Sequence, residues 1–198
     1  MNLALFDFDG TISFGDTFTP FLHFAVEPRR KAVGRVVLIP LIVGYKLGIV
    51  SPSATRARVA AFGFRGRREA DVRLAGSNYA RDVLPRTIRP KALKRINWHK
   101  AQGDVVVVVS GSLDVYLAEW CRGLDLDLIC TELEARDGTL TGRYRDGDCT
   151  GKEKARRILE KYNIRDYPVV YAYGDTTEDH EMLSIANKKY FRWREIAA

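Results

Sequence analysis

The stretch MNLALFDFDGTIS, residues 1–13, places two aspartates, Asp7 and Asp9, directly after the short apolar run LALF (3–6). An apolar run of this length that ends in a polar turn is typical of a buried strand in a parallel sheet. Two carboxylates so close together repel each other, and both are costly to remove from water. The stretch therefore predicts that a divalent metal, a basic side chain or solvent lies between them.

Two further runs, VVVVV (105–109) and VVYAY (169–173), share the character of the first. Helical patterns cover residues 90–103, 113–124 and 152–162, and Asp137-Gly138 within 129–144 predicts a hairpin turn. Strands that alternate with helices of this length predict an α/β fold with a doubly wound, Rossmann-like parallel sheet.

Residues 14–89 interrupt this alternation, because they show mostly helical spacing and no strand pattern. We expect about four helices here, inserted after the first strand. The predicted organisation is an α/β core formed by residues 1–13 and 90–198, with residues 14–89 as a helical cap.

The most apolar segment of the chain lies inside this predicted cap, at residues 33–50. Its uninterrupted part, 36–45, is only ten residues long and contains Pro40, whereas a bilayer-spanning helix needs about 20 residues. Two interpretations remain open. The favoured one is a buried cap helix. The other is a helix that enters a membrane surface, supported by the neighbouring bases Arg29, Arg30, Lys31, Arg35 and Lys46.

The chain has 198 residues and a net charge of +7, concentrated in residues 56–100, which hold 13 Lys or Arg against three Asp or Glu. Such a field attracts anionic substrates or anionic lipid headgroups, and a solvated basic face that only aids solubility is an equally open interpretation. We do not expect nucleic acid as a partner, because RNA-motif aromatics and paired zinc ligands are missing. Three cysteines without a CxxC pair and no signal peptide predict a cytoplasmic protein, with an anionic membrane surface as a further candidate location.

Polar residues follow each of the three predicted strands. They are Asp7 and Asp9 after the first, Ser110-Gly111-Ser112 after the second, and Asp175 and Asp179 after the third. Because ligands bind at the carboxyl ends of parallel strands, we expect these groups to converge. Several carboxylates in one pocket are typical of a Mg²⁺ site, and a bound cation would offset their repulsion.

The order DFDGT, a strand ending in serine, a lysine-bearing helix and GDxxxD resembles the haloacid dehalogenase (HAD) superfamily of aspartyl-phosphate phosphatases. The resemblance runs from Leu3 to about Leu183. An insertion directly after the first motif resembles the phosphoserine-phosphatase-like subclass, IB. YAYGDTTEDHEML and CTGKEK (149–154) are most similar to a bacterial branch that includes phosphatidylglycerophosphatase C.

The resemblance implies a role for each matching carboxylate. Asp7 is the expected nucleophile, which forms an aspartyl-phosphate. Asp9 is expected to protonate the leaving alcohol and then to deprotonate the attacking water. Mg²⁺ would be held by Asp7, the backbone carbonyl of Asp9, and Asp175, with Asp179 as a ligand or an orienting group.

It also implies roles for residues that contact the phosphoryl group. Ser110 is an expected catalytic and substrate-binding residue, together with Thr11 and Gly111. A lysine should neutralise charge on the phosphoryl oxygens. Lys154 is the favoured candidate, because the CTGKEK stretch matches the bacterial branch at this position. Lys152 is the alternative, because the spacing of the following apolar residues in the wider subclass also allows it.

These expectations define one leading function and two alternatives. The leading function is a Mg²⁺-dependent phosphomonoester hydrolase that acts on a small phosphate ester such as phosphoserine, or on a lipid headgroup phosphate such as phosphatidylglycerophosphate. The alternatives are a phosphotransferase that passes the phosphoryl group to an alcohol, and a non-catalytic basic module that binds membrane surfaces.

Overall fold

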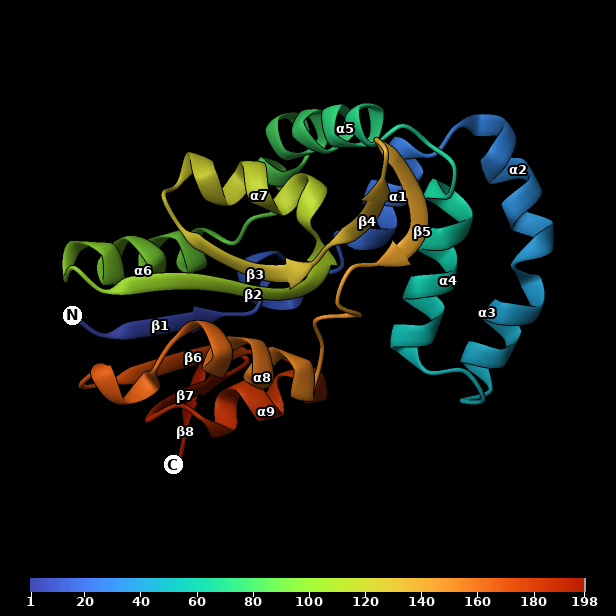
Figure 1. Ribbon diagram of the computed structural model, residues 1–198. Coiled ribbons are helices and arrows are strands. Elements are labelled where there is room, and N and C mark those ends of the chain that lie inside the picture. The colour runs from blue at the N-terminus through green and yellow to red at the C-terminus, as the bar shows by residue number, and fades with distance from the viewer. Residues whose placement is uncertain (198) are drawn as a thin grey trace.

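The computed structural model describes residues 1–197 and contains a six-stranded sheet in the order β3-β2-β1-β6-β7-β8 (Figure 1). The pairs from β3 to β7 are parallel, and β8 pairs antiparallel with β7. The predicted doubly wound α/β fold is thereby confirmed. The strands of this sheet are β1 (Leu3–Phe6), β2 (Val105–Leu113), β3 (Asp127–Thr131), β6 (Val170–Gly174), β7 (Lys188–Phe191) and β8 (Arg194–Ile196).

The central strand β1 is buried on both faces, as its unbroken apolar sequence predicts. Leu3 and Leu5 pack on one side of the sheet with Ile158, while Ala4 and Phe6 belong to the core on the other side. Helices therefore cover both faces. The α-helices outside residues 14–89 are α6 (Pro90–Ala101), α7 (Asp114–Gly123), α8 (Lys152–Lys161) and α9 (His180–Ser184).

Residues 14–89 form a helical layer beyond the carboxyl ends of the strands (Figure 1). The layer contains five α-helices rather than the four predicted, and a short 3₁₀ turn, η2 (Leu84–Arg86), follows them. The helices are α1 (Phe18–Ala25), α2 (Pro28–Val37), α3 (Ile39–Lys46), α4 (Pro52–Phe64) and α5 (Glu69–Asp82).

Two of the packing contacts between this layer and the rest of the molecule involve α7 and a β-hairpin. Helix α5 packs closely on α7, since a Cβ on Gly76 would lie 2.0 Å from the carbonyl oxygen of Val115. The predicted hairpin is confirmed as β4 (Leu133–Arg136) and β5 (Thr139–Tyr144), turning at Asp137-Gly138, and it packs on α4. The division into a core of 1–13 and 90–198 and a cap of 14–89 stays a prediction.

The favoured interpretation of residues 33–50 as a buried helix is wrong. The segment is split into α2 and α3 at Leu38, because Pro40 lacks an N–H group and is tolerated only in the first turn of a helix. None of the residues of α3 is buried. No helix within residues 1–197 has both the length and the apolar character needed to cross a bilayer.

One strand boundary also differs from the sequence prediction. Strand β2 continues to Leu113, so Ser110, Gly111 and Ser112 lie in its last residues rather than in a following turn. Its pairing with β3 shifts register between Ser110 and Leu113. Such a bulge changes the direction in which side chains point, which alters the access of the two serines to the pocket.

Candidate active site

A pocket of about 670 Å³ lies between the carboxyl ends of the strands and the helical layer. Asp7, Asp9, Ser112, Lys154 and Asp175 line it from the side of the sheet. The helical layer contributes both apolar side chains, among them Phe18, Leu22, Ile42, Tyr45 and Val59, and charged ones, which are Asp16, Lys46, Arg56 and Arg89. The carboxylates and Lys154 on the side of the sheet therefore face a surface that is partly apolar and mainly basic in its charge.

Lys154 lies at the centre of the charged side. It is located in the first turn of α8, is almost fully buried, and places Nζ 2.6 Å from Asp7 Oδ1 and 2.6 Å from Asp179 Oδ1. Burial alone would lower the pKa of Lys154, but the charges of Asp7 and Asp179 raise it above its usual range. Lys154 is therefore a fixed positive charge at this site.

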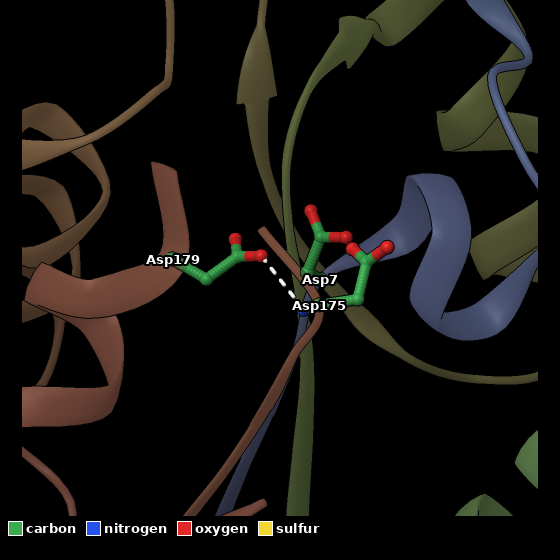
Figure 2. Close-up of side chains that lie close together, drawn as sticks. All are labelled: Asp7, Asp175 and Asp179. Atoms are coloured by element: carbon green, nitrogen blue, oxygen red, sulfur yellow. Dashed lines mark hydrogen bonds between the residues drawn. The ribbon is translucent and has the colours of Figure 1, made fainter. Parts of the chain in front are cut away.

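Asp179 is held by more donors than its neighbours. Besides Lys154, its carboxylate accepts a hydrogen bond at 3.0 Å from the backbone N–H group of Asp175 (Figure 2). It also accepts one at 3.0 Å from the N–H group of Thr176 and one from the Thr176 hydroxyl. Burial alone would raise its pKa, but Lys154 and these donors lower it. With both oxygens already bonded, Asp179 is suited to orient Lys154 and the Asp175 loop.

Asp7 and Asp175 lie next to each other, with Asp179 across from them (Figure 2). One carboxylate oxygen from each of the three falls within 4.8 Å of the others. Gly10 allows this approach, because its φ is +81° and a Cβ there would lie 2.2 Å from Asp175 Oδ2. The glycine of the DFDGT motif is therefore required sterically at this position.

The charges of this cluster fit a divalent cation. Burial raises the pKa of Asp7 well above its usual value, and Asp179 and Asp9 add to the effect, while Lys154 opposes it. Burial and the charge of Asp179 likewise raise the pKa of Asp175. Three ionised carboxylates and one ammonium group leave two negative charges, which one Mg²⁺ would neutralise with the oxygen ligands it prefers.

Asp9 is held apart from this cluster by its own hydrogen bonds. Its Oδ1 accepts from the N–H of Thr17 at 2.8 Å and from the Thr17 hydroxyl at 2.6 Å, and its Oδ2 accepts from the Ser112 hydroxyl. Burial raises its pKa, although these donors lower it in part. A fixed carboxyl with a raised pKa, lining the pocket, is suited to proton transfer.

Four of the predicted residues do not line the pocket, and they are Asp179, which lies behind Lys154 and Asp175, and Ser110, Thr11 and Lys152. Ser110 is fully buried and its Oγ accepts from the N–H of Ser112, while Thr11 is buried and donates to Asp175 Oδ1 at 3.3 Å. Lys152 is exposed at the start of α8. Gly111 does line the pocket. The roles that the resemblance implies for Ser110, Thr11, Lys152 and Gly111 stay predictions.

Many residues that line the pocket were missing from the predicted set, and two of them, Ser112 and Arg56, make polar contacts that shape the site. Ser112, which binds Asp9, belongs to the Ser110-Gly111-Ser112 sequence, but the sequence alone did not distinguish the two serines. Arg56 of α4 forms ion pairs with Asp148 at 3.0 Å and Glu178 at 3.3 Å. It thereby joins the helical layer to the loops before α8 and after β6. No sequence feature distinguished Arg56 from the other arginines of residues 56–100.

The structure combines a mostly parallel sheet between two layers of helices, carboxylates at the carboxyl ends of its strands, and a buried lysine in the first turn of α8. The chain belongs to the haloacid dehalogenase-like hydrolase family, whose model matches residues 4–184. The resemblance found in the sequence is thereby confirmed at family level, and the chain is an enzyme of the hydrolase class.

Known relatives agree with this assignment. Protein CicA of Caulobacter vibrioides is 33% identical over 192 residues, covering 96% of this chain and 85% of CicA. A Bordetella pertussis Tohama I protein of unknown function has a TM-score of 0.80 at 23% identity, covering 96% and 89% of the two chains. A phosphoserine phosphatase structure containing a phospho-aspartyl intermediate analogue has a TM-score of 0.65 at 23% identity, covering 96% and 85%. The fold is therefore phosphoserine-phosphatase-like, whereas the phosphatidylglycerophosphatase C-like branch stays a prediction.

Mg²⁺ should stabilise the folded protein through this cluster. We expect saturating Mg²⁺ to raise the unfolding temperature of the metal-free protein, because a ligand at 100 times its Kd contributes about 2.7 kcal/mol. Asp175→Asn should remove most of this rise in unfolding temperature. The matched control Asp137→Asn should keep the rise, because Asp137 lies in an exposed hairpin turn where asparagine before glycine is also favoured. Thermal unfolding with and without Mg²⁺ measures both. An undiminished shift in Asp175→Asn would place the ion elsewhere.

Proposed function

We propose that this protein is a Mg²⁺-dependent phosphatase that hydrolyses phosphate monoesters through an aspartyl-phosphate on Asp7. The observation that carries the proposal is the position of Lys154, buried between Asp7 and Asp179 with Asp175 beside them. Such a cluster supplies a nucleophilic oxygen and positive charge at one point of the pocket. The phosphoserine phosphatase with a phospho-aspartyl intermediate analogue supports it by similarity of fold.

In the first step, a carboxylate oxygen of Asp7 attacks phosphorus and the P–O bond to the alcohol breaks. Lys154 stabilises negative charge on the nucleophile and the phosphoryl oxygens. The bound cation, held by Asp7 and Asp175, would supply further positive charge for the same group. Gly111 and Ser112 line the pocket and are suited to contact a phosphoryl oxygen.

Asp9 provides the proton transfers on either side of the intermediate. In its protonated form it donates a proton to the oxygen of the leaving alcohol, and as a carboxylate it then accepts a proton from the water that attacks the aspartyl-phosphate. Thr17 and Ser112 fix both oxygens of Asp9, which limits the carboxyl to one orientation. Hydrolysis of the acyl phosphate releases inorganic phosphate and restores Asp7.

The expected result in solution is phosphate release that depends on Mg²⁺. We would measure release from an aryl phosphate, phosphoserine and micellar phosphatidylglycerophosphate, with EDTA and then with excess Mg²⁺. Turnover that EDTA removes and Mg²⁺ restores supports the proposal, and the preferred compound identifies the substrate class. A folded protein that releases phosphate from none of the three would contradict the proposal for these substrate classes.

A phosphotransferase would share the first step and differ in the second. Addition of glycerol or another alcohol acceptor to the same assay distinguishes them, because a transferase forms a new phosphate ester at the expense of free phosphate. We expect water to be the acceptor, so free phosphate should equal the substrate consumed. A new ester as the main product would favour the transferase.

A further inference from the structure

Helices α2 and α3 form the outer edge of the molecule, beyond α4 (Figure 1). Large apolar side chains along residues 33–49 are exposed to solvent, whereas α1 and α5 each bury several of theirs and expose one, Phe24 and Leu74. They are Val33, Val36, Val37, Ile39, Ile42, Val43, Tyr45, Leu47 and Ile49. So many exposed apolar side chains in one segment are typical of an interaction site.

The charge around this segment has a single sign. Between Glu27 and Glu69 the sequence contains ten Lys or Arg and no Asp or Glu. Lys31, Arg35 and Lys46 lie within α2 and α3 themselves, next to the exposed apolar side chains. The surface therefore combines apolar contact with positive charge, and it fits a partner that is both apolar and anionic.

A second copy of this chain does not provide that combination. A symmetric dimer through α2 and α3 would bring the same basic residues of both copies together, and like charges facing each other are unfavourable. An anionic bilayer offers acyl chains for the apolar residues and headgroup phosphates for the basic ones. The charge complementarity thus favours a membrane over self-association.

The same segment borders the candidate active site. Ile42, Tyr45 and Lys46 of α3 line the 670 Å³ pocket that contains Asp7. A separate apolar groove of about 400 Å³ runs between α1, α2, α3 and α4, and it shares Leu22, Ile42 and Lys46 with that pocket. Contact between α3 and a surface would therefore place the pocket close to that surface.

We propose that α2 and α3 are a membrane-docking surface, which we define as residues 28–50, and that it binds anionic bilayers peripherally. Val36, Leu47 and their exposed apolar neighbours enter the boundary between headgroups and acyl chains, and the basic residues contact lipid phosphates. The helices have ten and eight residues, too few to span the bilayer, so they lie in its surface. This binding is separate from catalysis and does not depend on the proposed phosphatase activity.

Vesicle flotation with the full chain tests the proposal. We expect the protein to float with phosphatidylcholine vesicles that contain phosphatidylglycerol, to float far less with phosphatidylcholine alone, and to be released as the salt concentration rises. The double variant Val36→Asp/Leu47→Asp should bind at least about tenfold more weakly, since both side chains are 68% exposed and each change places a negative charge at the membrane. Leu74→Asp, at a 64% exposed position on α5, is the matched control and should bind like wild type.

A fluorescent probe locates the contact independently. The three native cysteines are buried, so an environment-sensitive dye on Leu47→Cys labels one exposed position. Its emission should shift to the blue with anionic vesicles, and the same dye on Leu74→Cys should not shift. Each variant should fold like wild type, because none of the substituted side chains is buried or lines the active-site pocket. Thermal unfolding of each variant checks this.

Three results would overturn the proposal. The first is a wild-type protein that does not float with anionic vesicles at low salt. The second is a Val36→Asp/Leu47→Asp variant that floats as well as wild type. The third is a wild-type protein that does not float and instead forms an oligomer as its concentration rises, while the double variant stays monomeric. That result would assign this face to a second copy of the chain.

Discussion

Asp7→Asn should abolish phosphate release while leaving the protein folded and no less stable. We expect turnover to fall by at least about 10⁴-fold, since loss of a nucleophile removes the covalent route and leaves only binding and electrostatic effects. The free energy of unfolding, in contrast, should stay the same or rise. Asp7 is buried with a raised pKa, so ionising it in the folded state costs free energy at neutral pH, and an amide avoids that cost.

The measurement compares phosphate release and metal-free thermal unfolding for wild type, Asp7→Asn and the exposed control Asp137→Asn. The control should match wild type in both. Asp7→Asn should keep its ion-paired neighbours, because Lys154 still contacts Asp179 at 2.6 Å. An Asp7→Asn protein that retains turnover within about tenfold of wild type would rule out Asp7 as the nucleophile.

Lys154→Met should remove both activity and a large part of the stability. The change leaves Asp7 and Asp179 buried without their positive partner, and loss of one member of a buried ion pair typically costs about 3–5 kcal/mol. Lys152→Met is the matched control, two residues earlier on the exposed side of α8. Its effect should stay within about 0.5 kcal/mol. Denaturant unfolding and phosphate release measure the two effects, and equal losses in the two variants would contradict the assignment of Lys154.

A combined variant separates charge from packing. Asp7→Asn/Lys154→Met should be more stable than Lys154→Met alone, because it removes one of the unpaired buried carboxylates. Purely steric damage from methionine would instead persist unchanged in the combination. This comparison remains informative even if Lys154→Met is too inactive to assay.

The loss of stability in Lys154→Met should also depend on pH. Burial already raises the pKa of Asp7 in the folded state, and loss of Lys154 removes the charge that opposes this rise. The pKa of Asp179 also moves upward when Lys154 is lost, because Lys154 is one cause of its lowered value. Groups of this kind favour folding at low pH and disfavour it as the pH rises through their folded pKa. The deficit relative to wild type should therefore shrink as the pH falls toward the ordinary aspartate range near 3.9.

The sequence was most informative where local chemistry determines structure. Asp137-Gly138 predicted a tight hairpin because both residues tolerate positive φ, which they adopt at 50° and 73°. Apolar runs such as LALF predicted buried strands. The rule that ligands bind at the carboxyl ends of parallel strands predicted that Asp7 and Asp175 lie close together, and in the structure they do. The helix-bearing CTGKEK stretch supplied Lys154 as the favoured lysine, which is the one that the structure places in the cluster.

The errors arose where tertiary context decides. An apolar sequence does not state whether a partner covers it, so residues 33–50 were expected to be buried and are exposed. Ser110 and Ser112 differ only through the bulge at the end of β2, which depends on pairing with β3. Arg56 reaches Asp148 and Glu178 because α4 lies over two loops distant in sequence, and no local pattern encodes that contact.

The position of β1 in the sheet has a consequence for how the chain folds. Leu3 pairs with Val105 of β2 on one side and with Val170 of β6 on the other. The strand that leads into Asp7 is therefore early in the sequence, yet both of its neighbours come from far later in it. Parallel pairing over such separations is slow, because a long loop must close before any contact is gained. During synthesis on the ribosome, one edge of the first strand stays open until β2 has emerged, and the other stays open until β6 has emerged near the end of the chain. An apolar strand with an open edge is prone to aggregation in that period and is a substrate for chaperones.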